Sequence, residues 1–169
     1  MILQIREFRP GDEKTLRAVF LSSVHELAGR EYSQQQLDAW APRHHDELEW
    51  SARIQRLQPL IAEMEGAVVA YADLQPSGYI DHFYVAGSHA RRGVGSALME
   101  HIHATALARG MSELWAEVSL TAEPFFAKWG FVAETRNSVV ARGVQMFNIR
   151  MRKRLDLQGE PMAPGVRDL

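Results

Sequence analysis

The chain has 169 residues, of which 46% are hydrophobic and 24% are charged, and it contains no cysteine. Length and composition are ordinary for one globular domain. The missing cysteine excludes disulfides, a thiol nucleophile and cysteine-ligated metal sites. A net charge of −2 without a dominant basic stripe argues against nucleic acid as a partner. No apolar run reaches the roughly 20 residues that span a bilayer, and the first residues lack a signal-peptide core, so we expect a cytoplasmic protein with no membrane partner.

The first part of the chain predicts one strand followed by helices. Residues 2–8 alternate like a strand, and residues 13–29 carry apolar side chains at helical spacing. Ser33 is placed to cap a second, short helix that Pro42 ends. Residues 46–57 are predicted as a third helical segment.

From Pro59 onward the pattern changes to short strands. Glycines and Pro76 punctuate three runs that predict a β-meander, at 60–65, 66–74 and 78–85. The following elements are predicted as a helix from Val94 to Gly110, a strand at 113–119, a short helix at 122–129, and strands at 131–140 and 144–152. Residues 155–169 have no periodicity and are predicted to be a flexible tail. We therefore expect one α+β domain over residues 1–154, with the order β–α–α–β–β–β–α–β–α–β–β.

The most informative segment is the loop from Ser88 to Leu98, which joins a strand to an amphipathic helix. Gly93 and Gly95 let backbone amides approach a ligand closely. The first turn of the helix leaves N–H groups unpaired at the positive end of its dipole, which favours a phosphate. Two glycines alone are a weak signal, because glycines also form plain turns. The segment matches neither a Walker loop nor a dinucleotide fingerprint.

The order of elements and three motifs resemble the GCN5-related N-acetyltransferases (GNAT family). The motifs are a meander strand at 80–85, the loop at 90–95 opening a helix, and the Phe-x-x-x-Gly-Phe of residues 126–131. The resemblance covers residues 2 to about 153. Further segments are similar to a bacterial branch, the YafP-like acetyltransferases; they are 32–33, 39–42, 79–85 and 121–126.

The resemblance implies a mixed sheet of about seven strands flanked by helices and splayed between strands four and five. It implies acetyl-CoA as acyl donor, with the pantetheine arm in the gap and the pyrophosphate on the loop. Strand four would be residues 79–86. The donor-binding residues carried over from the family are Phe83, Tyr84, Val85, Arg91, Arg92, Gly93, Val94, Gly95, Ser96, Ser119, Thr121 and Phe126.

Two positions depart from the family pattern. Ala90 stands where the family prefers Arg or Gln, but backbone amides bind phosphate whatever side chain they carry. Phe126 stands where many members have a tyrosine that protonates the leaving thiolate. A phenyl ring cannot donate a proton, so the acid is another residue, water, or unnecessary. Tyr32 is our first candidate for a replacement hydroxyl.

Transfer to an amine requires a base that takes the ammonium proton, often through water. The candidates are His82, Asp81 and Glu117. On a regular strand His82 and Asp81 would point to opposite faces, and His82 has the more suitable intrinsic pKa. Each of the three has a structural interpretation as a hydrogen-bonded or solvated strand residue.

In this family the acceptor pocket is usually built before Pro59, where the sequence places Trp40, His44, His45 and Trp50. Both tryptophans are alternatively core residues. His101 and His103 point about 200° apart on a helix and cannot chelate, so we expect no metal site.

The predicted function is acetyl transfer from acetyl-CoA to an amine. The acceptor could be a small amine, an antibiotic, a peptide N-terminus or a protein lysine. The rivals are a non-catalytic acyl-CoA sensor and a nucleotide-binding protein of another fold. The resemblance also allows a homodimer, because late strands often pair between subunits in this family.

Overall fold

Three helices and a first strand form the N-terminal part of the chain in a computed structural model that describes residues 2–156. They are β1 (Leu3–Glu7), α1 (Glu13–Leu27), α2 (Gln34–Trp40) and α3 (Glu47–Leu57). The Ser33 hydroxyl accepts the Gln36 backbone N–H and the Gln36 side chain accepts the Ser33 N–H, a reciprocal capping box. The carboxylate of Asp46 caps α3 by accepting the N–H groups of its first turn. All four elements agree with the predictions.

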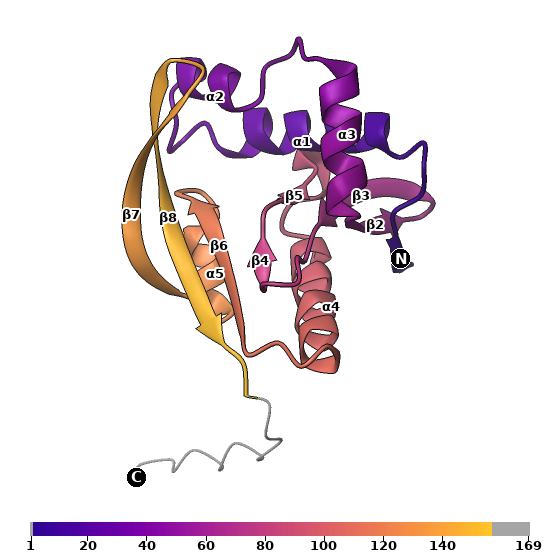
Figure 1. The fold of residues 1–169 in the computed structure, drawn as a ribbon. Helices are drawn as coiled ribbons and strands as arrows, with labels where there is room; N and C mark the ends of the chain where they lie inside the picture. The colour runs from indigo at the N-terminus through magenta and orange to yellow at the C-terminus, as the bar shows by residue number, and fades with distance from the viewer. Residues whose placement is uncertain (1, 157–169) are drawn as a thin grey trace.

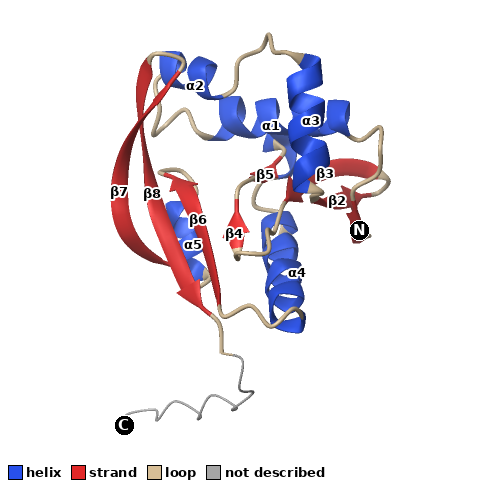
Figure 2. Cartoon of the chain, viewed as in Figure 1, coloured by secondary structure: helices blue, strands red, loops and turns tan. Residues whose placement is uncertain are grey.

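The first sheet has the order β1-β2-β3-β5 and is antiparallel throughout. Its other strands are β2 (Leu60–Met64), β3 (Ala67–Ala72) and β5 (Phe83–Val85). The second sheet has the order β4-β6-β8-β7. It is formed by β4 (Tyr79–Ile80), β6 (Glu113–Ser119), β7 (Val132–Ala141) and β8 (Val144–Arg154), and only its β4–β6 pair is parallel. Figure 2 shows β4 as a short strand beside β6.

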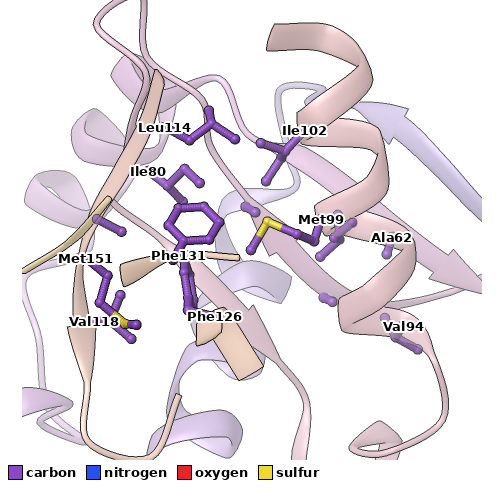
Figure 3. Close-up of a cluster of buried hydrophobic side chains, with 14 of the residues drawn as sticks. Ala62, Ile80, Val94, Met99, Ile102, Leu114, Val118, Phe126, Phe131 and Met151 are labelled. Atoms are coloured by element: carbon purple, nitrogen blue, oxygen red, sulfur yellow. The ribbon is translucent and has the colours of Figure 1, made fainter. Parts of the chain in front are cut away.

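Two apolar layers cover the strands. One contains α4 (Val94–Ala108) and α5 (Glu123–Lys128), whose side chains pack with β2, β3, β6 and β8. In Figure 3, Met99 and Ile102 from α4 lie near Phe126 from α5 and Phe131, which follows α5. The other layer contains α1, α2 and α3, packed on Ile61, Tyr71 and Tyr84. A short 3-10 helix, η1 (Gly87–His89), precedes α4.

The helices α1, α2 and α3 gather at one end of the molecule, where the long β7–β8 hairpin reaches α2 (Figure 1). The Arg142 guanidinium at the hairpin turn donates to the Ala39 carbonyl at 2.6 Å, and Gln36 donates to the Gln145 carbonyl at 2.9 Å. These bonds fix the hairpin against the N-terminal helices.

The predicted GNAT-like α+β architecture is confirmed, with three corrections. The predicted element order counted two helices before the meander, whereas α1, α2 and α3 all precede β2. The described strands form two four-stranded sheets and not one mixed sheet. Residues 79–86 do not form one strand: they form β4 and β5, which belong to different sheets. Residues 2–156 thus contain eight strands, or seven if β4 and β5 count as halves of the predicted fourth strand. Leu155, placed in the predicted tail, packs on the core and donates its N–H to the Ser112 carbonyl, while residues 157–169 lie outside the described part. Within the described residues, no helix combines the length and apolarity needed to cross a membrane.

Candidate active site

A buried carboxylate explains why strand four breaks. Asp73, which follows β3, is 0% exposed. Its Oδ1 accepts the backbone N–H of Asp81 at 2.8 Å and that of His82 at 2.7 Å. Its own N–H donates to the His82 carbonyl at 3.1 Å. These bonds keep residues 81 and 82 out of strand pairing. The chain therefore changes its pairing partner from β6 to β3 across these two residues.

Burial raises the pKa of Asp73 to about 6, although the N–H donors of His82 and Gln75 partly offset this effect. The carboxylate is therefore largely ionised at neutral pH. An ionised acceptor makes stronger bonds to backbone N–H groups than a neutral one does.

The break opens a gap between β5 and β6. Because β5 pairs with β3 and β4 pairs with β6, β5 and β6 are not neighbours in either sheet. A cavity of about 570 Å³ lies along this gap. It is lined by Ser23, Val24, Leu27 and Ala28 of α1 and its end, by Trp40, by Phe83, Tyr84 and Val85 of β5, by Ala90, Arg91, Gly93, Gly95 and Ser96 near the start of α4, and by Ser119, Thr121, Ala122, Phe125 and Lys128.

The register of β5 decides which of its backbone groups face the gap. The His82 carbonyl and the Ala86 N–H bond to the β3 side, and Tyr84 is paired with Tyr71. Backbone groups alternate in direction along an antiparallel strand. The N–H and C=O groups of Phe83 and Val85 therefore point toward the gap, whereas those of Tyr84 are directed to β3 and only its side chain lines the cavity.

The start of α4 supplies the other end of the cavity. Gly93 is its N-cap with φ +83°, and no side chain caps the helix. A Cβ built on Gly93 would meet nothing within 4 Å, whereas one on Gly95 would lie 3.4 Å from the Phe125 ring. The first turn thus presents unpaired amides to an open space, beside the positive end of the helix dipole and Arg91. These features match what a pyrophosphate requires.

Most of the predicted donor-binding residues line this cavity. The exceptions are Arg92, Val94, which is buried in the core, and Phe126, which lines a smaller neighbouring cavity. Ser119 Oγ accepts the Ala122 N–H at 3.1 Å, so it also stabilises the turn that leads into α5. Thr121 donates to Glu31 at 2.9 Å. Lys128 and the α1 residues carried no sequence signal for this site, because periodicity alone does not show which face of a helix meets a cavity.

A second cavity of about 60 Å³ continues from the first. It is lined by Trp40, Ile80, Asp81, Phe83, Tyr84, Ala116, Glu117, Val118, Ser119, Ala122 and Phe126, of which Trp40, Phe83, Tyr84, Ser119 and Ala122 line both. Asp81 is exposed here and accepts the Tyr79 hydroxyl at 3.4 Å. Glu117 is held by Arg150 at 2.5 Å and by Asn137 at 2.7 Å. Two of the three predicted bases therefore meet at this cavity.

His82, the third candidate, lies elsewhere. It is 5% exposed, lines neither cavity, and packs among the rings of Phe20, Trp50, Tyr71 and Tyr84. Its Nδ1 is 3.0 Å from the Tyr71 hydroxyl. Burial lowers the pKa of His82 to about 4, so the ring is neutral at pH 7. The suitable titration range that the sequence suggested is lost in the folded protein.

The candidate replacement acid, Tyr32, is occupied by structural bonds. Its hydroxyl donates to the Phe147 carbonyl at 2.6 Å and accepts the Leu120 N–H at 3.0 Å, and it lines neither cavity. Phe126 is 3% exposed and packs edge-on against Phe83 and Phe131. No hydroxyl thus occupies position 126.

Among the predicted acceptor residues, Trp40 reaches the site. It lines both cavities and donates its Nε1–H to the Tyr84 hydroxyl at 3.3 Å. Trp50 is a core residue, and its Nε1–H donates to the Glu13 carbonyl at 2.7 Å. His44 and His45 are exposed and line neither cavity. In the described part of the chain, no three ligand-type side chains gather as a metal site would require.

Comparison with known proteins assigns the family. The family profile described as "Acetyltransferase (GNAT) domain" matches residues 29–155. The chain therefore belongs to the GNAT family and is an N-acetyltransferase. It is 35% identical over 150 residues to the N-acetyltransferase YafP of Escherichia coli, covering 89% of this chain and 95% of that protein, which supports the YafP-like branch.

Solved structures agree with this assignment. A GCN5-related N-acetyltransferase from Rhodopseudomonas palustris superposes with a TM-score of 0.85 at 35% identity, covering 92% of this chain and 99% of that one. PaiA N-acetyltransferase from Thermoplasma acidophilum, solved with coenzyme A, gives a TM-score of 0.71 at 17% identity, covering 92% and 100% of the two chains, and shows a shared fold.

Proposed function

We propose that this chain transfers the acetyl group of acetyl-CoA directly to a primary amine. The observation that carries the proposal is the gap between β5 and β6. It connects an uncapped helix N-terminus to a small cavity that contains an exposed carboxylate. PaiA, which shares the fold, is described with coenzyme A bound.

The chain's own groups fit each part of the donor. Amides at the start of α4 would hold the pyrophosphate, with Arg91 and Lys128 adding positive charge at the same cavity. The free backbone groups of Phe83 and Val85 would pair with the amides of the pantetheine arm, as an added strand would. The thioester itself supplies an activated carbonyl.

On the acceptor side, we assign proton removal to Asp81. Its carboxylate is exposed at the small cavity, where it can accept the ammonium proton directly or through water. The carboxylate of Glu117 already accepts hydrogen bonds from Arg150 and Asn137. We therefore assign Glu117 to an ion pair with Arg150 and not to proton transfer. Trp40 and Tyr84 line the same cavity.

One observation favours a second candidate, a non-catalytic acyl-CoA sensor. The phenyl ring of Phe126 stands where the family resemblance places a proton donor, and it is buried. A sensor binds CoA and acetyl-CoA but releases no thiol with any amine.

A thiol-release screen with acetyl-CoA distinguishes the two functions. The panel contains small amines, aminoglycoside antibiotics, peptides with free N-termini and lysine peptides. Release that depends on one class of amine supports the transferase. If CoA stabilises the fold but no amine in the panel causes thiol release from acetyl-CoA, the sensor is supported. If CoA does not stabilise the fold, both functions are contradicted.

The family resemblance allows a homodimer, and β7 is a candidate strand for the contact between subunits. It is an edge strand, because among the described strands it pairs only with β8. Val140 on this strand is 73% exposed. We propose that a second copy pairs there. Sedimentation should then show a dimer that Val140→Lys weakens, whereas a monomeric parent protein contradicts the pairing.

A further inference from the structure

Tyr84 and Trp40 are neighbours that each line both cavities. The Tyr84 hydroxyl oxygen accepts the Trp40 Nε1–H at 3.3 Å. Within residues 2–156, Trp40 is the hydrogen-bond partner of this hydroxyl, and no acceptor for its proton is found there. The O–H group is therefore available to a ligand in the gap.

The other three of the four tyrosines are committed elsewhere. The Tyr32 hydroxyl donates to a backbone carbonyl, and that of Tyr79 donates to Asp81. The Tyr71 hydroxyl is fully buried against His82 Nδ1. Tyr84 is thus the tyrosine whose proton a reacting group could use.

The surroundings keep Tyr84 in the form of a hydrogen-bond donor. Burial raises the pKa of its hydroxyl, so the group stays protonated at every physiological pH. The ring is held edge-on by Phe20 at 4.8 Å between centroids and by His82 at 5.4 Å. Donation from Trp40 to the oxygen polarises the O–H bond and strengthens its own donation.

We propose that the Tyr84 hydroxyl donates a hydrogen bond to the donor's sulfur atom as the C–S bond breaks. This inference rests on the proposed function. The acceptor nitrogen forms the N–C bond, the electron pair of the C–S bond remains on sulfur, and the nitrogen's proton passes to Asp81 or water. Tyr84 stabilises the negative charge on sulfur, and the thiolate takes its proton from solvent after release. A hydroxyl on β5 thereby replaces the one that Phe126 lacks.

Tyr84→Phe tests the inference because it removes only the hydroxyl. Loss of one preorganised donor should lower kcat about 10²–10³-fold with little change in KM for acetyl-CoA. A second readout needs no amine. The thiol pKa of enzyme-bound CoA, followed by the ultraviolet absorbance of its thiolate, should lie below that of free CoA and return to the free value or above in the variant.

Tyr32→Phe is the matched control, since it also removes one hydroxyl. It should lower thermal stability and leave the bound-thiol pKa unchanged, because its bonds are to backbone groups. The inference is overturned if Tyr84→Phe keeps the parental kcat and the parental bound-thiol pKa. It is also overturned if the bound-thiol pKa changes in Tyr32→Phe alone. If the parent releases no thiol with any amine, the proposed transfer fails, and the bound-thiol pKa still decides the role of Tyr84.

Discussion

Asp73 and His82 are adjacent buried groups whose titrations oppose each other. The pKa of Asp73 is raised to about 6 and that of His82 is lowered to about 4, both mainly by burial. Between pH 4 and 6, folding adds a proton to Asp73, whereas the unfolded chain holds one on His82. The Asp73 contribution to stability is complete at low pH and is lost as the pH rises through 6. The His82 contribution is complete above about 6.5 and is lost as the pH falls toward 4.

Single substitutions should expose each contribution. In Asp73→Asn, which keeps an oxygen for the two N–H groups, the unfolding free energy should rise with pH across this window by about 1.4 kcal/mol per unit relative to the parent. In His82→Gln it should fall by a similar slope. Urea unfolding at several pH values measures both slopes. Equal slopes in the parent and in both variants would contradict these pKa shifts.

The proton transfer at Asp81 is a second prediction at the scale of single residues. Asp81→Asn should lower kcat by roughly 10²–10⁴-fold while the affinity for CoA stays unchanged. Asp38→Asn is a suitable control, because Asp38 is exposed on α2 and lines neither cavity. Steady-state kinetics and calorimetry with CoA give the two quantities. Normal turnover in Asp81→Asn together with its loss in Glu117→Gln would move the base to β6.

At the scale of elements, the two ends of α4 offer a matched pair of glycines. Gly93 (φ +83°) and Gly110 (φ +70°) both have left-handed backbone and open space where a Cβ would stand, but only Gly93 lines the cavity. Valine at either position should cost about 1–2 kcal/mol through backbone strain. Gly93→Val alone should abolish the rise in melting temperature that CoA produces. A full CoA shift in Gly93→Val contradicts the phosphate site, and loss of the shift in both variants indicates general damage.

The elements themselves were largely predictable because their signals are local. Ser33 with Gln36 three residues later, and Pro42 after Trp40, mark the ends of α2 within a short stretch of chain. The break in strand four gives no such signal, since Ile80 and His82 are both buried as in an unbroken strand. Its cause, Asp73, lies eight residues before Asp81 and acts through a buried side chain. A pattern of polarity cannot show which distant carboxylate binds a backbone amide.

The site was only partly predictable for the same reason. The loop before α4 was identified because its glycines and the start of the helix are both recognisable from the local sequence. The position of His82 depends on rings at 20, 50 and 71, which the fold alone brings together. The bonds of Tyr32 reach residues 120 and 147. Roles that depend on such long-range partners require the structure.

For the whole molecule, the gap between the two sheets predicts where a bound donor protects the backbone. Hydrogen exchange at the Phe83 and Val85 amides should slow on addition of CoA, because those amides face the gap. The Tyr84 amide should change little, since its group is directed to β3. Exchange is measured by NMR with CoA and with adenosine 3′,5′-bisphosphate, which lacks the pantetheine arm. The comparison separates protection by the arm from protection by the nucleotide. Equal slowing at all three amides with both ligands would point to global stabilisation instead.

The division of strand four also has a consequence in time. The hairpins β2–β3 and β3–β5 join segments that are close in the chain, and such pairings form early. Tyr79 and Ile80 find their partners Trp115 and Ala116 only after the whole of α4 has been made. During synthesis on the ribosome, the donor cleft is therefore among the last features to be completed. We expect newly made chains to remain unable to bind CoA until the second sheet has closed.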